Sequence, residues 1–84
     1  STAVDTPTWS NANYGAAKAA AEAWARSAAS GFAKGGTAAS VILAVQSLGD
    51  SDGATSVSAL ADRIATLWDE PAAELNGARL TLAP

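Results

Sequence analysis

The apolar side chains of this sequence are mostly too small to fill a core by themselves. Forty-one of the 84 residues are apolar, but 23 of these are alanine, which leaves 13 Val, Ile or Leu and five aromatic residues. A domain of this length buries about 60% of the surface that its unfolded chain exposes. We therefore expect at most one small domain, and one that needs the surface of a partner to complete its core.

Composition also excludes several kinds of site. The chain has no cysteine, no histidine and only eight dispersed carboxylates, so we expect no disulfide, no thiolate chemistry and no metal site. The net charge is −3 and the five cations are scattered, which excludes nucleic acid as a main partner. No stretch approaches the ~18 consecutive apolar residues of a membrane span. We expect a cytoplasmic protein without a membrane partner.

Changes in hydrophobic spacing divide the chain into segments. Residues 1–13 mix Ser, Thr, Asn, Asp and Pro without a sustained period, which predicts a loop. The following segment is rich in alanine, the best helix former, and contains no proline. The expected elements are a helix at 14–30, a strand at 37–45, a helix at 56–69 and, after an Asn76-Gly77 turn, a strand at 78–82.

The order strand, helix, strand over residues 37–82 is that of a βαβ crossover. Such a crossover implies two parallel strands joined by a right-handed connection. A parallel sheet is covered on both faces and contains further strands, which these 84 residues do not provide. We therefore predict an α/β fold in which residues 1–84 form a single partial domain.

The first helix has two faces of different chemistry. Its expected buried face follows spacings of three and four through Tyr14, Ala17, Ala21, Trp24, Ala25, Ala28 and Phe32. Lys18, Glu22 and Arg26 recur at intervals of four and can form a solvent-exposed ladder of ion pairs. Trp24 and Trp68 lie in apolar helical stripes, so we expect both in the core or in an interface.

Tyr14 and Lys18 are the one pair of side chains that suits proton transfer. Four residues on a helix place both on one face, one turn apart. An ammonium ~4 Å from a phenolate contributes ~4 kcal/mol at an effective dielectric near 20 but only ~1 kcal/mol in water, so burial decides whether the pair works. Ser1 lies in a loop that can return to the helix start and offer a hydroxyl to the same carbonyl. The alternative is that Lys18 belongs to the ion-pair ladder and that Tyr14 is an interface aromatic.

These residues resemble the active site of a known enzyme family. Tyr14-Gly-Ala-Ala-Lys18 resembles the Tyr-x-x-x-Lys motif of the short-chain dehydrogenases/reductases, and YGAAKAAAEAWARSAA is similar along its length to their active-site helix. Ser1 stands where the catalytic serine of the family is expected. The segments 37–45, 56–69 and 78–82 look like its sixth strand, last helix and seventh strand. The resemblance covers the whole chain and corresponds to the C-terminal third of a doubly wound, Rossmann-like fold.

The resemblance implies an NAD(P)-dependent oxidoreductase that transfers a hydride between NAD or NADP and a small carbonyl or alcohol substrate. It implies that Tyr14 is the catalytic acid/base and that Ser1 orients the substrate carbonyl. It also implies that Lys18 stabilises the phenolate and that Tyr14 and Lys18 contact the cofactor at its nicotinamide ribose. Trp9, in the loop before Tyr14, would lie near the substrate.

The glycine-rich dinucleotide turn of the family does not occur in these 84 residues. The resemblance therefore implies a missing N-terminal portion or a partner chain that completes the sheet, and we expect the isolated chain to be inactive. It also implies a homo-oligomer through the Tyr14–Ser30 helix, where small residues let a second helix approach closely: Ala16, Ala20, Ala23 and Ser27. Gln46-Ser47 replaces the Pro-Gly that the family has after its sixth strand. The alternative is a non-catalytic, degenerate subunit that acts as an interaction or structural module.

Overall fold

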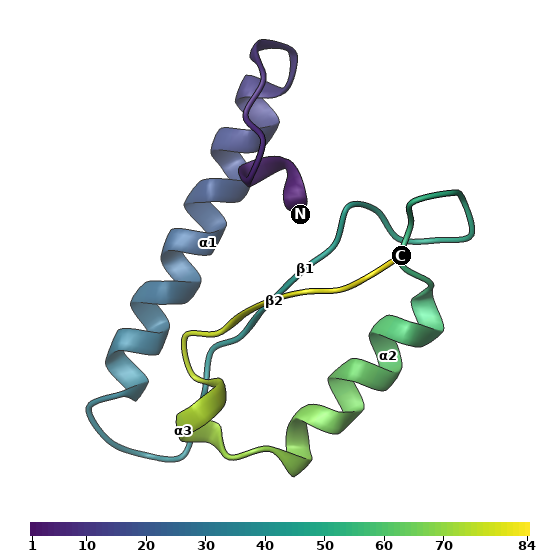
Figure 1. Ribbon diagram of the computed structural model, residues 1–84. Coiled ribbons are helices and arrows are strands. Elements are labelled where there is room, and N and C mark those ends of the chain that lie inside the picture. Colours follow the sequence, from purple (N-terminus) through teal and green to yellow (C-terminus); the bar gives the residue numbers. More distant parts are fainter.

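The computed structural model describes residues 1–84 as a mixed α/β chain with the predicted order of helix, strand, helix and strand (Figure 1). Its main elements are α1 (Ala12–Phe32), β1 (Ile42–Ala44), α2 (Val57–Thr66) and β2 (Arg79–Thr81). The shorter helices are η1 (Thr2–Val4), η2 (Trp9–Asn11), η3 (Leu67–Asp69) and α3 (Ala72–Leu75). None of the helices has both the length and the apolar character that crossing a membrane requires.

The helices begin and end where the local sequence favours it. α1 consists of 21 proline-free, alanine-rich residues, and it is followed by Gly36 with a positive φ of 94°. The Ser56 side chain caps α2 by accepting a hydrogen bond of 3.1 Å from the Ala59 amide. The helix predicted at 56–69 tightens into η3 before Pro71, a residue that cannot continue a helix.

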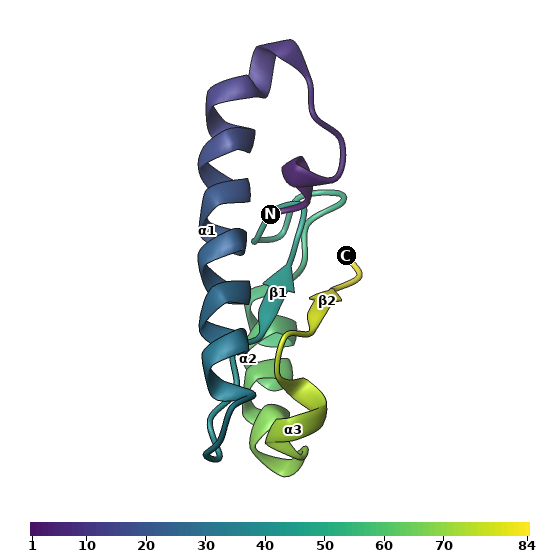
Figure 2. The ribbon, with the colours of Figure 1, turned by 90° about the vertical axis from the view of Figure 1, so that its left-hand side faces the viewer.

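β1 and β2 pair in parallel, which confirms the strand direction expected from the βαβ order. Ile42 lies opposite Arg79, and Ala44 lies opposite Thr81. α1 and α2 flank the strand pair on opposite sides (Figures 1 and 2). Both strands are three residues long and shorter than predicted.

The edge of β1 that faces away from β2 is open. The Ile42 amide donates to the Ala78 carbonyl, and the Ala44 carbonyl accepts from the Leu82 amide, both at 2.9 Å. Backbone groups alternate in direction along a parallel strand, so those of Leu43, between these two residues, point to the other edge. No strand pairs with that edge.

The molecule is a thin slab rather than a sphere. Its Cα atoms span 41 × 28 × 12 Å, and its radius of gyration of 14.1 Å exceeds the about 12 Å of a compact domain of this length. Its accessible surface is 5685 Å², against about 4,600 Å² for a compact monomer of this mass. Only six residues are buried, four of them apolar: Ala29, Ala44, Ala54 and Leu75. The core is as thin as the alanine content predicts.

The buried face predicted for α1 is wrong in most of its positions. Tyr14, Ala17, Ala21, Trp24 and Phe32 are exposed, whereas Ala25 and Ala28 are partly buried as predicted. The other positions turned toward the rest of the chain are Gly15, Ala19, Glu22 and Ala29. Residues far along the chain make polar contacts with this face of α1. The spacing of apolar residues in the sequence does not reveal such contacts. Trp24 and Trp68 are 75% and 89% exposed, so neither contributes to a core within this chain.

Asn76 joins the end of α1 to the two strands. Its Nδ2 donates to the Ala29 carbonyl at 2.8 Å, and its Oδ1 accepts from the Ser40 amide at 3.0 Å. The Ser40 hydroxyl in turn donates to the Ala25 carbonyl at 2.9 Å. The next residue, Gly77, has a φ of 84°, so the predicted Asn-Gly turn is present and brings the chain close to Ala29.

We predict that Asn76→Ala lowers the free energy of unfolding by about 2 kcal/mol, because it leaves a part-buried carbonyl and amide without their partner. Asn13→Ala, at an exposed position of α1, is the matched control and should cost less than about 0.5 kcal/mol. Urea unfolding of the two variants measures the difference. Equal midpoints for both would contradict the role given to Asn76.

Candidate active site

Ser1 is held at the C-terminal end of β1 by a hydrogen bond to its own carbonyl and by one from the next residue. The Thr2 amide donates to the Val45 carbonyl at 3.0 Å, and Nη2 of Arg79 donates to the Ser1 carbonyl at 3.3 Å. The N-terminus lies beside this end of β1 in both views (Figures 1 and 2). The first loop thus returns Ser1 to the side of α1.

Ser1 lines two open hollows beside α1. One, of about 670 Å³, is lined by residues that include Ser1, Tyr14 and Gln46. The other, of about 180 Å³, is lined by Ser1, Lys18 and Glu22. The structure therefore brings all three candidate residues, Ser1, Tyr14 and Lys18, to adjoining parts of one surface.

Tyr14 and Lys18 are neighbours on α1 but face solvent. The Lys18 ammonium lies 5.5 Å from the centre of the Tyr14 ring, and Tyr14 is 52% exposed. Two unit charges at about this separation interact by about 3 kcal/mol at an effective dielectric of 20, but by less than about 1 kcal/mol in water. The pair can therefore support proton transfer only where a further surface excludes water from it.

The Ser1 hydroxyl is free to donate a hydrogen bond. Its oxygen accepts a hydrogen bond of 3.1 Å from the Ala3 amide and thereby caps η1. A hydroxyl that accepts one hydrogen bond can still donate another. Ser1 is thus oriented by η1 and can present a donor to an oxygen atom in the hollow that it shares with Tyr14.

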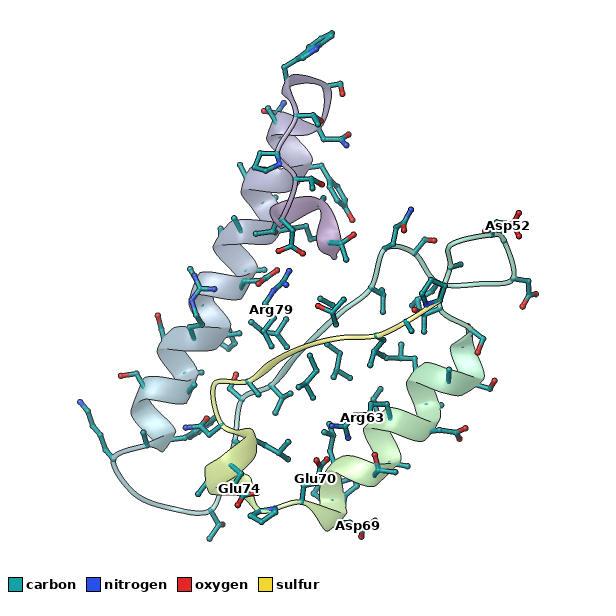
Figure 3. The ribbon with its side chains drawn as sticks, in the orientation of Figure 1. Asp52, Arg63, Asp69, Glu70, Glu74 and Arg79 are labelled. Carbon is teal, nitrogen blue, oxygen red and sulfur yellow. The ribbon has the colours of Figure 1, made fainter.

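The site is fixed by an ion-pair cluster that sequence reasoning missed. Nε of Arg79 donates to Oε1 of Glu22 at 2.7 Å, and Nη2 contacts Oε2 of Glu22 at 3.3 Å and Oδ2 of Asp5 at 3.2 Å. In Figure 3, Arg79 lies between α1 and the strands. Arg79 therefore ties β2 to α1 and to the loop that carries Ser1. The signal that could have revealed it is a single cation in the otherwise uncharged strand 78–82.

The ion-pair ladder of Lys18, Glu22 and Arg26, which was the alternative role for Lys18, is not formed at its middle residue. Glu22 is only 7% exposed and turns inward to Arg79, and no ion pair joins it to Lys18 or to Arg26. Lys18 consequently remains free to bind another group. Trp9 is 93% exposed and lines a different hollow from the one that Ser1 and Tyr14 share.

The same cluster sets the protonation of Glu22. The hydrogen bond from Arg79 holds the pKa of the Glu22 carboxyl below its ordinary value, against the opposing effect of burial. The contact also raises the pKa of the Arg79 guanidinium. Glu22 is therefore charged at neutral pH. No group of three or more acidic residues is arranged to hold a metal ion.

Comparison with family models, with curated proteins and with solved structures finds no match to this chain. The resemblance to the short-chain dehydrogenases/reductases therefore rests on the residues themselves, and the roles of Ser1, Tyr14 and Lys18 stay predictions.

We predict that the Glu22–Arg79 contact makes the protein sensitive to acid. Because the pKa of Glu22 is lower in the folded state, its contribution to stability is present above about pH 4.3, the unfolded value, and is lost as the pH falls through the folded value. Glu22→Gln should lower stability at pH 7 and flatten the acid limb of the profile, below the unfolded value. Glu74→Gln, at an exposed position without an ion pair, is the control. Superimposable profiles for the wild type and Glu22→Gln would contradict the prediction.

Proposed function

We propose that this chain is part of an NAD(P)-dependent oxidoreductase of the short-chain dehydrogenase/reductase type, which transfers a hydride between the cofactor and a carbonyl or alcohol. The observation that carries the proposal is that Ser1, thirteen residues before Tyr14, lines a hollow with Tyr14 and a second hollow with Lys18. A hydroxyl, a phenol and an ammonium beside one another match the motif that the sequence resembles. The parallel strands between two helices are compatible with a Rossmann-like sheet.

The residues fit one end of a dinucleotide. Lys18 forms no ion pair within the chain, and the Tyr14 side chain is half exposed, so both can meet the hydroxyls of a nicotinamide ribose. No Gly-x-Gly-x-x-Gly turn occurs in the sequence, so residues of another segment or chain must hold the pyrophosphate. NAD and NADP are equally compatible with Tyr14 and Lys18. When bound, the cofactor supplies or accepts the hydride.

In the reduction direction, Tyr14 gives its phenolic proton to the carbonyl oxygen, and the phenolate that remains is stabilised by the Lys18 ammonium. Ser1 donates a hydrogen bond to the same oxygen and thereby holds the carbonyl in line with Tyr14. In the oxidation direction, the Tyr14 phenolate accepts the proton of the alcohol. These roles need a surface that covers Tyr14, so the isolated chain is expected to be inactive.

The covering surface is a missing N-terminal portion or a partner chain that supplies the next strand beside β1. The open edge of β1 and the large accessible surface support this proposal.

The second candidate function is that of a non-catalytic interaction module. It is favoured by the outer face of α1, on which Ala16, Ala20, Ala23 and Ser27 are all exposed at spacings of three and four beside the exposed Trp24. Small residues in such a row allow close approach of a second helix. A homo-oligomer through α1 is compatible with either function.

We predict that, in the complete protein, Tyr14→Phe lowers turnover by about 10²–10⁴ while cofactor binding stays nearly unchanged, because the substitution keeps the ring and removes the transferable proton. Lys18→Ala should weaken both turnover and cofactor binding, because the ammonium serves the phenolate and the ribose. Lys34→Ala, at an exposed position just after α1, is the control. Steady-state rates with a carbonyl substrate and titrations with NADH or NADPH measure the two effects. Equal rates for the wild type and Tyr14→Phe would favour the non-catalytic module.

A further inference from the structure

A groove on the far side of the molecule from α1 is apolar and only partly covered. It has a volume of about 520 Å³ and runs between the end of α2 and the segment that leads into β1. Its wall on the helical side is formed by Ile64, Leu67 and Trp68, and on the strand side by Val41. Trp68 is 89% and Ile64 is 46% exposed. Large apolar side chains that remain exposed together mark an interaction site more often than a free surface.

The residues of the helical wall suit a partner helix. Ile64, Leu67 and Trp68 follow one another at intervals of three and one, so they form a continuous ridge along the end of α2 and η3. An amphipathic helix binds such a groove through apolar side chains at spacings of three, four and seven. An exposed tryptophan on the ridge is the type of residue that dominates binding energy at interfaces.

The segment that forms the helical wall of the groove carries an excess of negative charge. Residues 57–75 contain four carboxylates, Asp62, Asp69, Glu70 and Glu74, and one cation, Arg63, which gives a net charge of −3. The other four carboxylates and four cations of the chain cancel, so the whole net charge of the protein lies in this segment. Asp69, Glu70 and Glu74 lie near the junction of η3 and α3 (Figure 3); Glu70 lines the groove and is paired with Arg63 at 2.7 Å, whereas Asp69 and Glu74 form no ion pair within the chain.

We propose that this groove binds an amphipathic helix of a partner protein that carries Lys or Arg beside its apolar residues. The apolar ridge supplies the contact area, and the unpaired carboxylates of Asp69 and Glu74 select a cationic partner and repel an anionic one. An anionic membrane surface is disfavoured by the same carboxylates. The proposal depends on the groove alone and not on the oxidoreductase chemistry of Ser1, Tyr14 and Lys18, so each can fail without the other.

The test uses two fluorescein-labelled helical peptides of about 18 residues with the same leucine face, one with Lys and one with Glu beside it. Fluorescence anisotropy with the complete protein should show saturable binding of the Lys peptide, which would be lost if another part of the same protein covered the groove. The Glu peptide should bind at least about fivefold more weakly in about 0.05 M salt, and the difference should vanish in about 1 M salt, where charges are screened.

Trp68→Ala and Ile64→Ala should each weaken binding of the Lys peptide, Trp68→Ala by about tenfold or more. Trp24→Ala, which removes another exposed tryptophan from α1, is the matched control and should leave binding unchanged. Amide exchange at Ile42, whose amide donates to Ala78 of the neighbouring β2 segment, reports whether each variant keeps its fold. Failure of the Lys peptide to bind, equal binding of both peptides at low salt, or equal effects of Trp68→Ala and Trp24→Ala would overturn the proposal. Sedimentation that shows a dimer dissociated by Trp68→Ala would overturn it too, because the occupant would then be a second copy.

Discussion

The parallel pairing of β1 with β2 is the contact on which the arrangement of the chain depends. It turns α2 into a crossover connection, so α1 and α2 lie on opposite sides of the strands. It brings Arg79 of β2 to Glu22 of α1, where the guanidinium also reaches the Ser1 carbonyl. A pair of parallel strands is weak by itself, and here it is stabilised by the polar contacts of Arg79 and Asn76 rather than by a large apolar core.

The position of Ser1 also depends on the strand pair. The Val45 carbonyl, just after β1, accepts a hydrogen bond from the Thr2 amide, and together with the Arg79 contact to the Ser1 carbonyl this bond holds Ser1 near Tyr14 and Lys18. The candidate catalytic groups are therefore brought together by backbone contacts of the strands, although they remain open to water. The proposed chemistry therefore depends on a further surface that covers them, and the open edge of β1 is the place proposed for it.

Much of the fold could be predicted from local patterns, and the failures share one cause. The alanine-rich segment, the Asn76-Gly77 turn and the apolar run before Gln46 gave the correct order of elements and the parallel direction. The buried face of α1 could not be predicted, because it contains the charged Glu22, whose partner is 57 residues away. Ser1, Tyr14 and Lys18 can be predicted as a site because they match a sequence motif. Arg79, which holds α1 and the Ser1 loop against β2, belongs to no local pattern.

Amide hydrogen exchange at Leu43 tests the central claim, that the sheet continues past β1. The Ile42 amide is bonded within the β1 and β2 pair and serves as the internal reference, whereas the Leu43 backbone points to the open edge. In the complete protein or assembly, Leu43 should become protected to about the same degree as Ile42. Free exchange of Leu43 in the complete protein would show that β1 is a true edge and would contradict this account.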